Sequence, residues 1–131
     1  MCVRVSIEIP RAGLEYFFYR EANNYATTLA QLQRFNEVKS LLRDLLPVTR
    51  RVLGESHLIT FGIRCLYAVS LYKDTGATLD DLHAAVETLE DAGRAARRVL
   101  GGEHPLTMGS EVDLRFARAT LRARETRRPH A

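Results

Sequence analysis

The chain has 131 residues, of which 46% are hydrophobic and 27% are charged, and this balance is typical of a single globular domain. Its two cysteines, Cys2 and Cys65, lack metal-ligand spacing and are expected to be reduced thiols, and no apolar run approaches the ~18 residues that cross a membrane. The formal net charge of +3 is too small to predict nucleic-acid binding by itself, and the N-terminus lacks a leader pattern, so a cytoplasmic location is expected.

The first eleven residues have a pattern of their own. Val3, Val5, Ile7 and Ile9 alternate with polar side chains, and Pro10 closes the run. Alternation of this kind predicts an extended segment. Because no second strand-like run follows, we expect residues 1–11 to form an extended arm or a tail that does not belong to the folded domain.

From residue 12 to residue 125 the apolar residues recur at helical spacing. They predict five helices, at about 12–33, 36–53, 58–74, 78–100 and 105–125, followed by a flexible tail at 126–131. In the last helix two apolar sets are expected to face inward: Val112, Phe116, Ala119 and Ala123, and with them Leu114, Ala117 and Leu121. The short connections favour antiparallel neighbours, so the predicted fold is an all-α stack of hairpins.

Residues that begin, bend and end helices support these boundaries. Asn36 is the expected N-cap of the second helix, and Pro47 is expected to bend that helix without ending it. Thr78 and Asp81 form a capping-box pair at the start of the fourth helix. Pro105 opens the fifth helix in its first turn, where a missing N–H costs no hydrogen bond.

One phrase occurs twice in the chain. Residues 50–62 read RRVLGESHLITFG and residues 97–109 read RRVLGGEHPLTMG, so that eight of thirteen positions are identical at an offset of 47. Gly54 and Gly101 are expected to be the left-handed residues that end the preceding helices. A period in this range indicates stacked hairpins, here about 12–54 and 58–101 with a half repeat at 105–125. Such repeats usually form surfaces for other proteins.

The doubled phrase resembles the linker between tetratricopeptide repeats of the kinesin light chain type. That linker has Leu-Gly, two variable residues and His-Pro; the matching residues are Leu100, Gly101, His104 and Pro105, and in the first copy Leu53, Gly54 and His57. Asn23-Asn24-Tyr25-Ala26 resembles the Asn-Asn-Leu-Ala signature of the same family, and Gln33 stands where the family prefers glycine at a turn. The resemblance covers roughly residues 20–118. It implies a tetratricopeptide-like α–α superhelix that acts as a scaffold for a peptide or a protein.

The length of the repeat changes along the chain. Tyr67-Ala68 correspond to Tyr25-Ala26 at an offset of 42, the usual length in the resembled family, whereas the linkers are offset by 47. About five residues are therefore expected to be inserted near 73–79. They would lengthen the loop between the third and fourth helices.

In the resembled family, the first helix of each repeat lines a groove that binds the partner. The resemblance therefore implies a binding surface on the first, third and fifth helices, made of Asn23, Asn24, Thr27, Gln31, Arg64, Arg115, Arg118 and Arg122. An arginine row can hold carboxylates by bidentate hydrogen bonds, so the expected partner is a protein or peptide, and an acidic peptide is one that this surface would fit. Three other interpretations remain open: a solvated face on a terminal helix, a basic surface for nucleic acid without the interleaved aromatics that base stacking needs, and a module that serves self-association only.

Nothing in the sequence predicts catalysis. His57 and His104 are at equivalent places in successive repeats, about 10 Å or more apart on helix-packing distances, which is too far to share a metal ion. Each is expected to bond a turn or a helix end. Cys65 is expected to pack against the core, and no serine or cysteine has a base at a meaningful spacing. We therefore expect no enzymatic activity, no metal and no cofactor.

Overall fold

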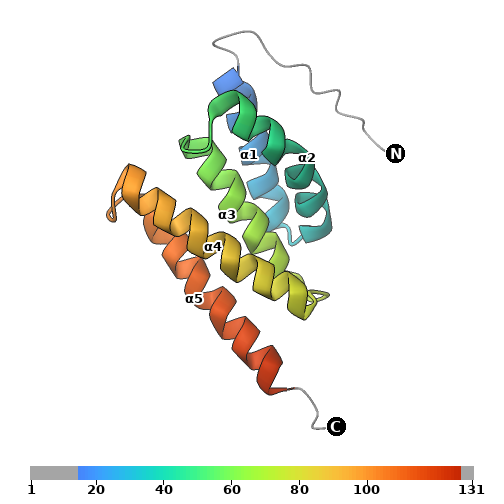
Figure 1. Cartoon of the computed structure of the whole chain (residues 1–131). Coiled ribbons are helices and arrows are strands. Elements are labelled where there is room, and N and C mark those ends of the chain that lie inside the picture. Colours follow the sequence, from blue (N-terminus) through green and yellow to red (C-terminus); the bar gives the residue numbers. More distant parts are fainter. Residues whose placement is uncertain (1–14, 128–131) are drawn as a thin grey trace.

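The computed structural model describes residues 15–127 and contains five α-helices in that range (Figure 1). They are α1 (Glu15–Gln31), α2 (Phe35–Leu53), α3 (Leu58–Lys73), α4 (Leu79–Leu100) and α5 (Pro105–Thr126). No strand occurs among the described residues, so the predicted all-α fold is confirmed. The arm predicted at residues 1–11 and most of the tail lie outside the described residues. None of the five helices is both long enough and apolar enough to cross a membrane.

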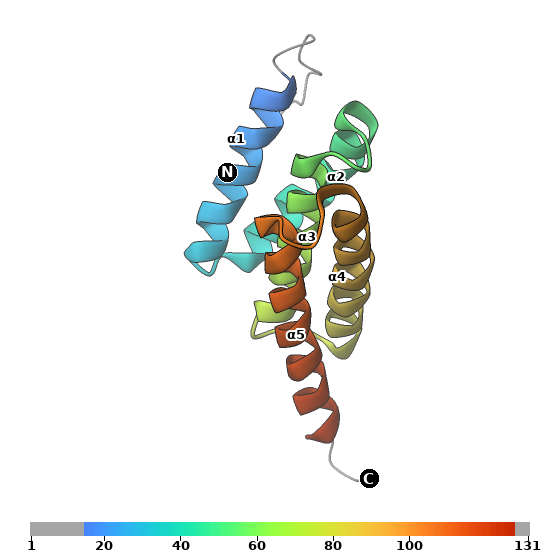
Figure 2. The same ribbon diagram turned by 90° about the vertical axis from the view of Figure 1, so that its left-hand side faces the viewer.

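The helices form two layers. Each helix runs antiparallel to the one before it and packs against it, and α3 also contacts both α1 and α5. No contact joins α2 to α4 within the described range. Figure 2 shows α2 and α4 on one side of the stack and α1 and α5 on the other. The first helices of the hairpins therefore lie in one layer and the second helices in the other, which is the arrangement expected of stacked hairpins.

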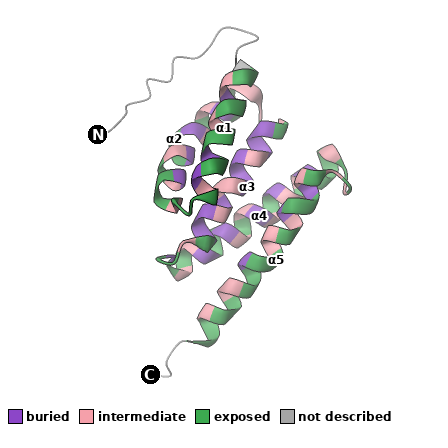
Figure 3. Ribbon diagram, turned by 180° about the vertical axis from the view of Figure 1, so that it is seen from behind, coloured by how far each residue is buried: buried purple, intermediate pink, exposed green. Residues whose placement is uncertain are grey.

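Helix α3 lies at the centre of the core. Ile59 and Ile63 on one side of α3 join a buried cluster with α1 and α2. Cys65, Ala68 and Tyr72 on another side join a second cluster with α4 and with Ala117 of α5. Because α3 has neighbours on both sides, it buries far more of its surface than either end helix (Figure 3).

The turn between α1 and α2 corrects one predicted helix boundary. Gln33 has a φ of 60°, and this positive value explains why glycine is the preferred residue at such a turn. The N–H of Arg34 then donates to the Leu29 carbonyl at 2.9 Å, so the chain has already reversed at this residue. Arg34 is the N-cap, without a side-chain hydrogen bond to the backbone, and the prediction of Asn36 as the cap is wrong.

The five-residue insertion is divided between a loop and a helix. The loop between α1 and α2 spans residues 32–34, and the loop between α3 and α4 spans residues 74–78, so the second loop is only two residues longer. The other three residues extend the second helix of the hairpin, from 19 residues in α2 to 22 in α4. The longer loop is held by Lys39 of α2, whose Nζ lies 2.7 Å from Oδ2 of Asp74. Thr78 and Asp81 form the predicted capping box behind it.

Candidate functional site

The two copies of the repeated phrase have the same backbone geometry. Gly54 has φ 96° and ψ 159°, and Gly101 has φ 89° and ψ 158°. Their N–H groups donate to the carbonyls of Arg50 and Arg97 at 3.0 and 3.1 Å. Both residues have the positive φ predicted for them, although their ψ is extended, in a region that essentially only glycine occupies. The two linkers therefore turn the chain from one hairpin to the next in the same way.

The two linker histidines begin the helices that follow. Nδ1 of His57 accepts the N–H of Ile59, and Nδ1 of His104 accepts the N–H of Leu106, both at 3.1 Å. This confirms the prediction that each histidine bonds a helix end. The copies differ at one position: Thr60 Oγ1 donates to the Gly54 carbonyl at 2.8 Å, whereas the buried Thr107 Oγ1 has no hydrogen-bond partner among the described residues.

The predicted surface residues of α1 do not lie on one open face. Asn24, Thr27 and Gln31 are exposed, and the hydroxyl of Thr27 donates to the carbonyl of Asn23 at 2.9 Å. The Asn23 side chain is partly buried and faces α3, where its Nδ2 lies 3.5 Å from the place of a β-carbon on Gly62. Its Oδ1 is buried and has no hydrogen-bond partner among the described residues. Asn23 is therefore part of the α1–α3 packing as well as of the predicted surface.

Arg64 is in a different environment from the one predicted. Only 9% of this residue is exposed, and its Nη1 lies 3.8 Å from Oε1 of Glu55 in the linker between α2 and α3. The same carboxylate group approaches Nε of Arg50 at 3.2 Å. Arg64 therefore packs inside the stack against the linker and is not an outward-facing residue.

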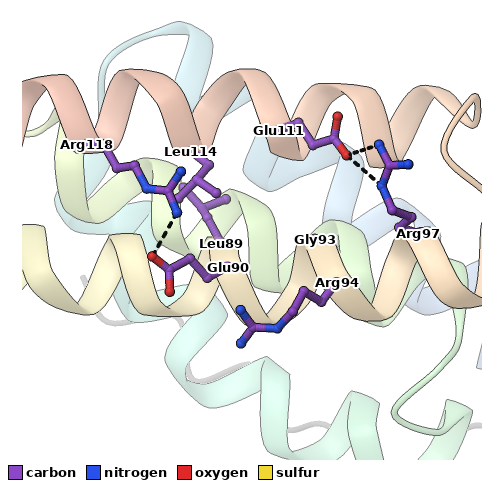
Figure 4. Close-up of a pocket in the computed structure, with 8 residues that line it drawn as sticks. All are labelled: Leu89, Glu90, Gly93, Arg94, Arg97, Glu111, Leu114 and Arg118. Atoms are coloured by element: carbon purple, nitrogen blue, oxygen red, sulfur yellow. Dashed lines mark hydrogen bonds and ion pairs between the residues drawn. The ribbon is translucent and has the colours of Figure 1, made fainter.

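The arginines of α5 fall into two groups. Arg118 lies beside α4, and its Nη2 donates to Oε1 of Glu90 at 3.1 Å (Figure 4). On the same seam, Glu111 accepts two hydrogen bonds from Arg97, at 3.1 and 2.7 Å. These pairs border a shallow groove of about 200 Å³ between α4 and α5, and they neutralise most of its charge. Arg115 and Arg122 are exposed and form no ion pair with any described residue.

The structure buries only one of the two apolar sets of α5. Leu114, Ala117 and Leu121 pack against the cluster formed with α3 and α4, as predicted. Val112, Phe116, Ala119 and Ala123 are exposed, so the prediction that they face inward is wrong. Two apolar stripes on one helix indicate two packing faces, and this signal was present in the sequence. Only the face of Leu114, Ala117 and Leu121 has a neighbour among the described helices.

Three ionisable groups are buried or partly buried where α3 packs against α5. Burial raises the pKa of the Cys65 thiol from 9.0 to about 12, so the thiol stays protonated near neutral pH. The hydroxyl of Tyr72 donates to Oδ1 of Asp113 at 3.0 Å and links α3 to α5. Burial also raises the pKa of Asp113, which this hydrogen bond opposes. No group of His, Cys, Asp and Glu side chains within the described range is arranged to hold a metal ion.

The local geometry is the only guide to what this surface does. No model of a known protein family, no curated protein and no solved structure matches the chain. The surface features that a partner could contact include the polar residues of α1, the arginines Arg115 and Arg122, and the exposed stripe beside them.

Proposed function

We propose that the chain is a non-catalytic scaffold of tetratricopeptide-like hairpins that binds a protein or peptide segment along the first helices of the hairpins. The observation that carries the proposal is the repeated linker, which has the same glycine and histidine geometry in both copies. Equal linkers set successive hairpins in register, with α1, α3 and α5 in one layer. Layers of this kind offer extended surfaces to other proteins. A cytoplasmic location is part of the proposal, and the free thiol of Cys65 fits a reducing compartment.

Two arginines are the best candidates for selecting the partner. Arg115 and Arg122 lie two turns apart on the same side of α5, are exposed, and form no ion pair with a described carboxylate. A guanidinium group can hold a carboxylate through two parallel hydrogen bonds, which favours acidic segments. Asn24 and Gln31 on α1 add exposed amides that bond to extended backbone as readily as to side chains. Arg64 and Arg118 are weaker candidates, because Arg64 is buried and Arg118 pairs with Glu90.

A peptide array tests the proposal. The wild-type chain should retain acidic peptides better than neutral ones, and the double variant Arg115→Glu/Arg122→Glu should lose this preference. Arg43→Glu is the matched control, because Arg43 is an exposed arginine of α2 in the opposite layer. Equal binding of acidic and neutral peptides, or equal behaviour of the two variants, would contradict the proposed selection of acidic partners.

The remaining alternatives give different results. A nucleic-acid surface requires binding to an oligonucleotide that weakens steeply as salt is raised. Of the arginines near the C-terminus, Arg94, Arg97 and Arg118 pair with carboxylates and Arg124 bonds to the Ala77 carbonyl, which lowers the charge available to phosphates. A module that serves assembly only would bind no peptide and would form oligomers at micromolar concentration, as measured by light scattering.

A further inference from the structure

Helix α5 has an exposed apolar stripe along its whole length. Met108 is 54% exposed, Val112 is 39% exposed and Phe116 is 59% exposed, and Ala119 and Ala123 continue the stripe at helical spacing. Figure 3 shows α5 largely in the colours of exposed and intermediate residues, in contrast to α3. A row of large apolar side chains in water on one helix face marks a surface that another element covers.

The equivalent residues of α3 show how this helix face is packed in the other copy of the repeat. At the offset of 47 residues set by the linkers, Met108, Val112 and Ala119 of α5 correspond to Phe61, Cys65 and Tyr72 of α3. These three α3 residues are 1%, 7% and 5% exposed. Phe116 corresponds to Val69, which is partly buried against the same cluster, and Ala123 corresponds to Gly76, beyond the end of α3. Most of this helix face is therefore covered in the middle of the stack and open on α5.

Two elements cover this face on α3. Cys65, Ala68 and Tyr72 belong to the cluster that holds Leu82, Ala85 and Leu89 of α4, and α5 adds Ala117 and the hydrogen bond between Asp113 and Tyr72. The second helix of the hairpin thus supplies most of the apolar cover. Within the described residues, α5 has no second helix of its own. Helix α4 packs antiparallel against α3 and covers its apolar face. An antiparallel amphipathic helix in the equivalent position would cover the exposed stripe of α5.

The charges beside the stripe define the chemistry of that helix. Arg115 stands at the position of Ala68, next to the stripe, and Arg122 follows two turns later on the same side. Neither has a carboxylate partner in the described part of the chain, whereas Arg118 and Arg97 on the α4 seam each have one. We infer that α5 docks an acidic amphipathic helix from a partner protein, which completes the third hairpin. This inference rests on the proposed scaffold function and names the class of ligand.

A second copy of the chain fits the stripe less well. An antiparallel α5–α5 pair would bring Arg115 and Arg122 of one copy next to the same residues of the other, and like charges destabilise such pairs. The acid-rich half of α4 is a suitable probe for the inferred ligand, because it has Asp80, Asp81 and Glu87 on a helix that already packs against α3 in this fold.

The test uses a peptide of residues 78–93, TLDDLHAAVETLEDAG, titrated into the full chain and followed by NMR. We expect shifts concentrated on α5, with binding that is about a hundredfold weaker in Phe116→Asp, since this change puts a charge in the apolar contact. Arg115→Glu/Arg122→Glu should weaken binding about tenfold. Tyr25→Asp is the control, because Tyr25 is equally exposed but lies on α1. A peptide with lysine in place of its five acids should bind Arg115→Glu/Arg122→Glu better than wild type.

Four outcomes would overturn the inference. Two concern the contact itself: unchanged binding of the peptide to Phe116→Asp, or equal binding of a scrambled peptide of the same composition. The third is peptide binding that appears only after residues 1–14 are deleted, and the fourth is a wild-type dimer that Phe116→Asp makes monomeric. The third would identify the N-terminal segment as the occupant, and the fourth a second copy. The docked helix can be disproved while the proposed scaffold function is retained. That result would be an acidic preference on the peptide array that is lost in Arg115→Glu/Arg122→Glu but unaffected by Phe116→Asp.

Discussion

Replacing the two linker glycines by alanine tests the repeated junction most directly. A β-carbon at Gly54 or Gly101 would meet no atom within 4 Å, so Gly54→Ala and Gly101→Ala introduce no clash. Their whole effect comes from holding alanine at φ 96° and ψ 159°, or at φ 89° and ψ 158°. Such backbone strain costs about 1–3 kcal/mol, and the lower entropy of the unfolded alanine chain offsets about 0.4–1 kcal/mol of it.

The expected result is a loss of about 1–2 kcal/mol in the free energy of unfolding for each variant. The two losses should be equal, because the two junctions have the same geometry. They should also add in the double variant, because distant sites without shared partners behave independently. Urea denaturation followed by circular dichroism at 222 nm measures all three values, provided that the slope with denaturant stays constant.

Gly109→Ala is the matched control, and its expected change in the free energy of unfolding has the opposite sign. Gly109 lies inside α5 with open space around it, so alanine there should stabilise the helix by about 0.5–1 kcal/mol. A neutral Gly54→Ala, or losses at positions 54 and 101 that differ by more than the error of measurement, would refute the conclusion that the two linkers are equivalent. The reverse change Gln33→Gly should stabilise the chain, since glycine adopts the positive φ of position 33 without the strain that a side chain adds.

Three further predictions concern side chains. His57→Ala and His104→Ala should each lower the free energy of unfolding by about 1 kcal/mol, as N-cap losses do, and His57→Asn should recover most of it in the same urea experiment. Because burial raises the pKa of Cys65 to about 12, its alkylation by iodoacetamide at pH 8, in a variant with serine at the other cysteine, should require unfolding; fast labelling without urea would disprove this. The hydrogen bond from Lys39 lowers the pKa of Asp74, so its stabilisation is present above the unfolded pKa and is lost as pH falls through the folded one. Lys39→Met should therefore weaken the fall in melting temperature as the pH is lowered through the acidic range in which Asp74 takes up its proton, and an unchanged pH profile would contradict that role.

The helices and most of their junctions could be predicted from the amino-acid sequence, because they depend on interactions between residues close together in the chain. Periodic apolar residues predict a helix and its approximate length, Thr78 and Asp81 form a capping box at the start of α4, and glycine is favoured where φ is positive, as at Gly54 and Gly101. The doubled phrase also predicted, correctly, that Gly54 and Gly101 would have like surroundings.

The partners of the predicted surface arginines could not be predicted from the sequence, because they lie on other segments of the fold. Arg64 is buried beside Glu55 of the preceding linker and Arg118 pairs with Glu90 on α4, and neither contact follows from sequence spacing. Helix periodicity places Val112 and Leu114 on different faces, but it does not say which face a neighbour covers. Burial is a property of contacts between distant segments, so the exposed stripe of α5 became visible only when the helices were assembled.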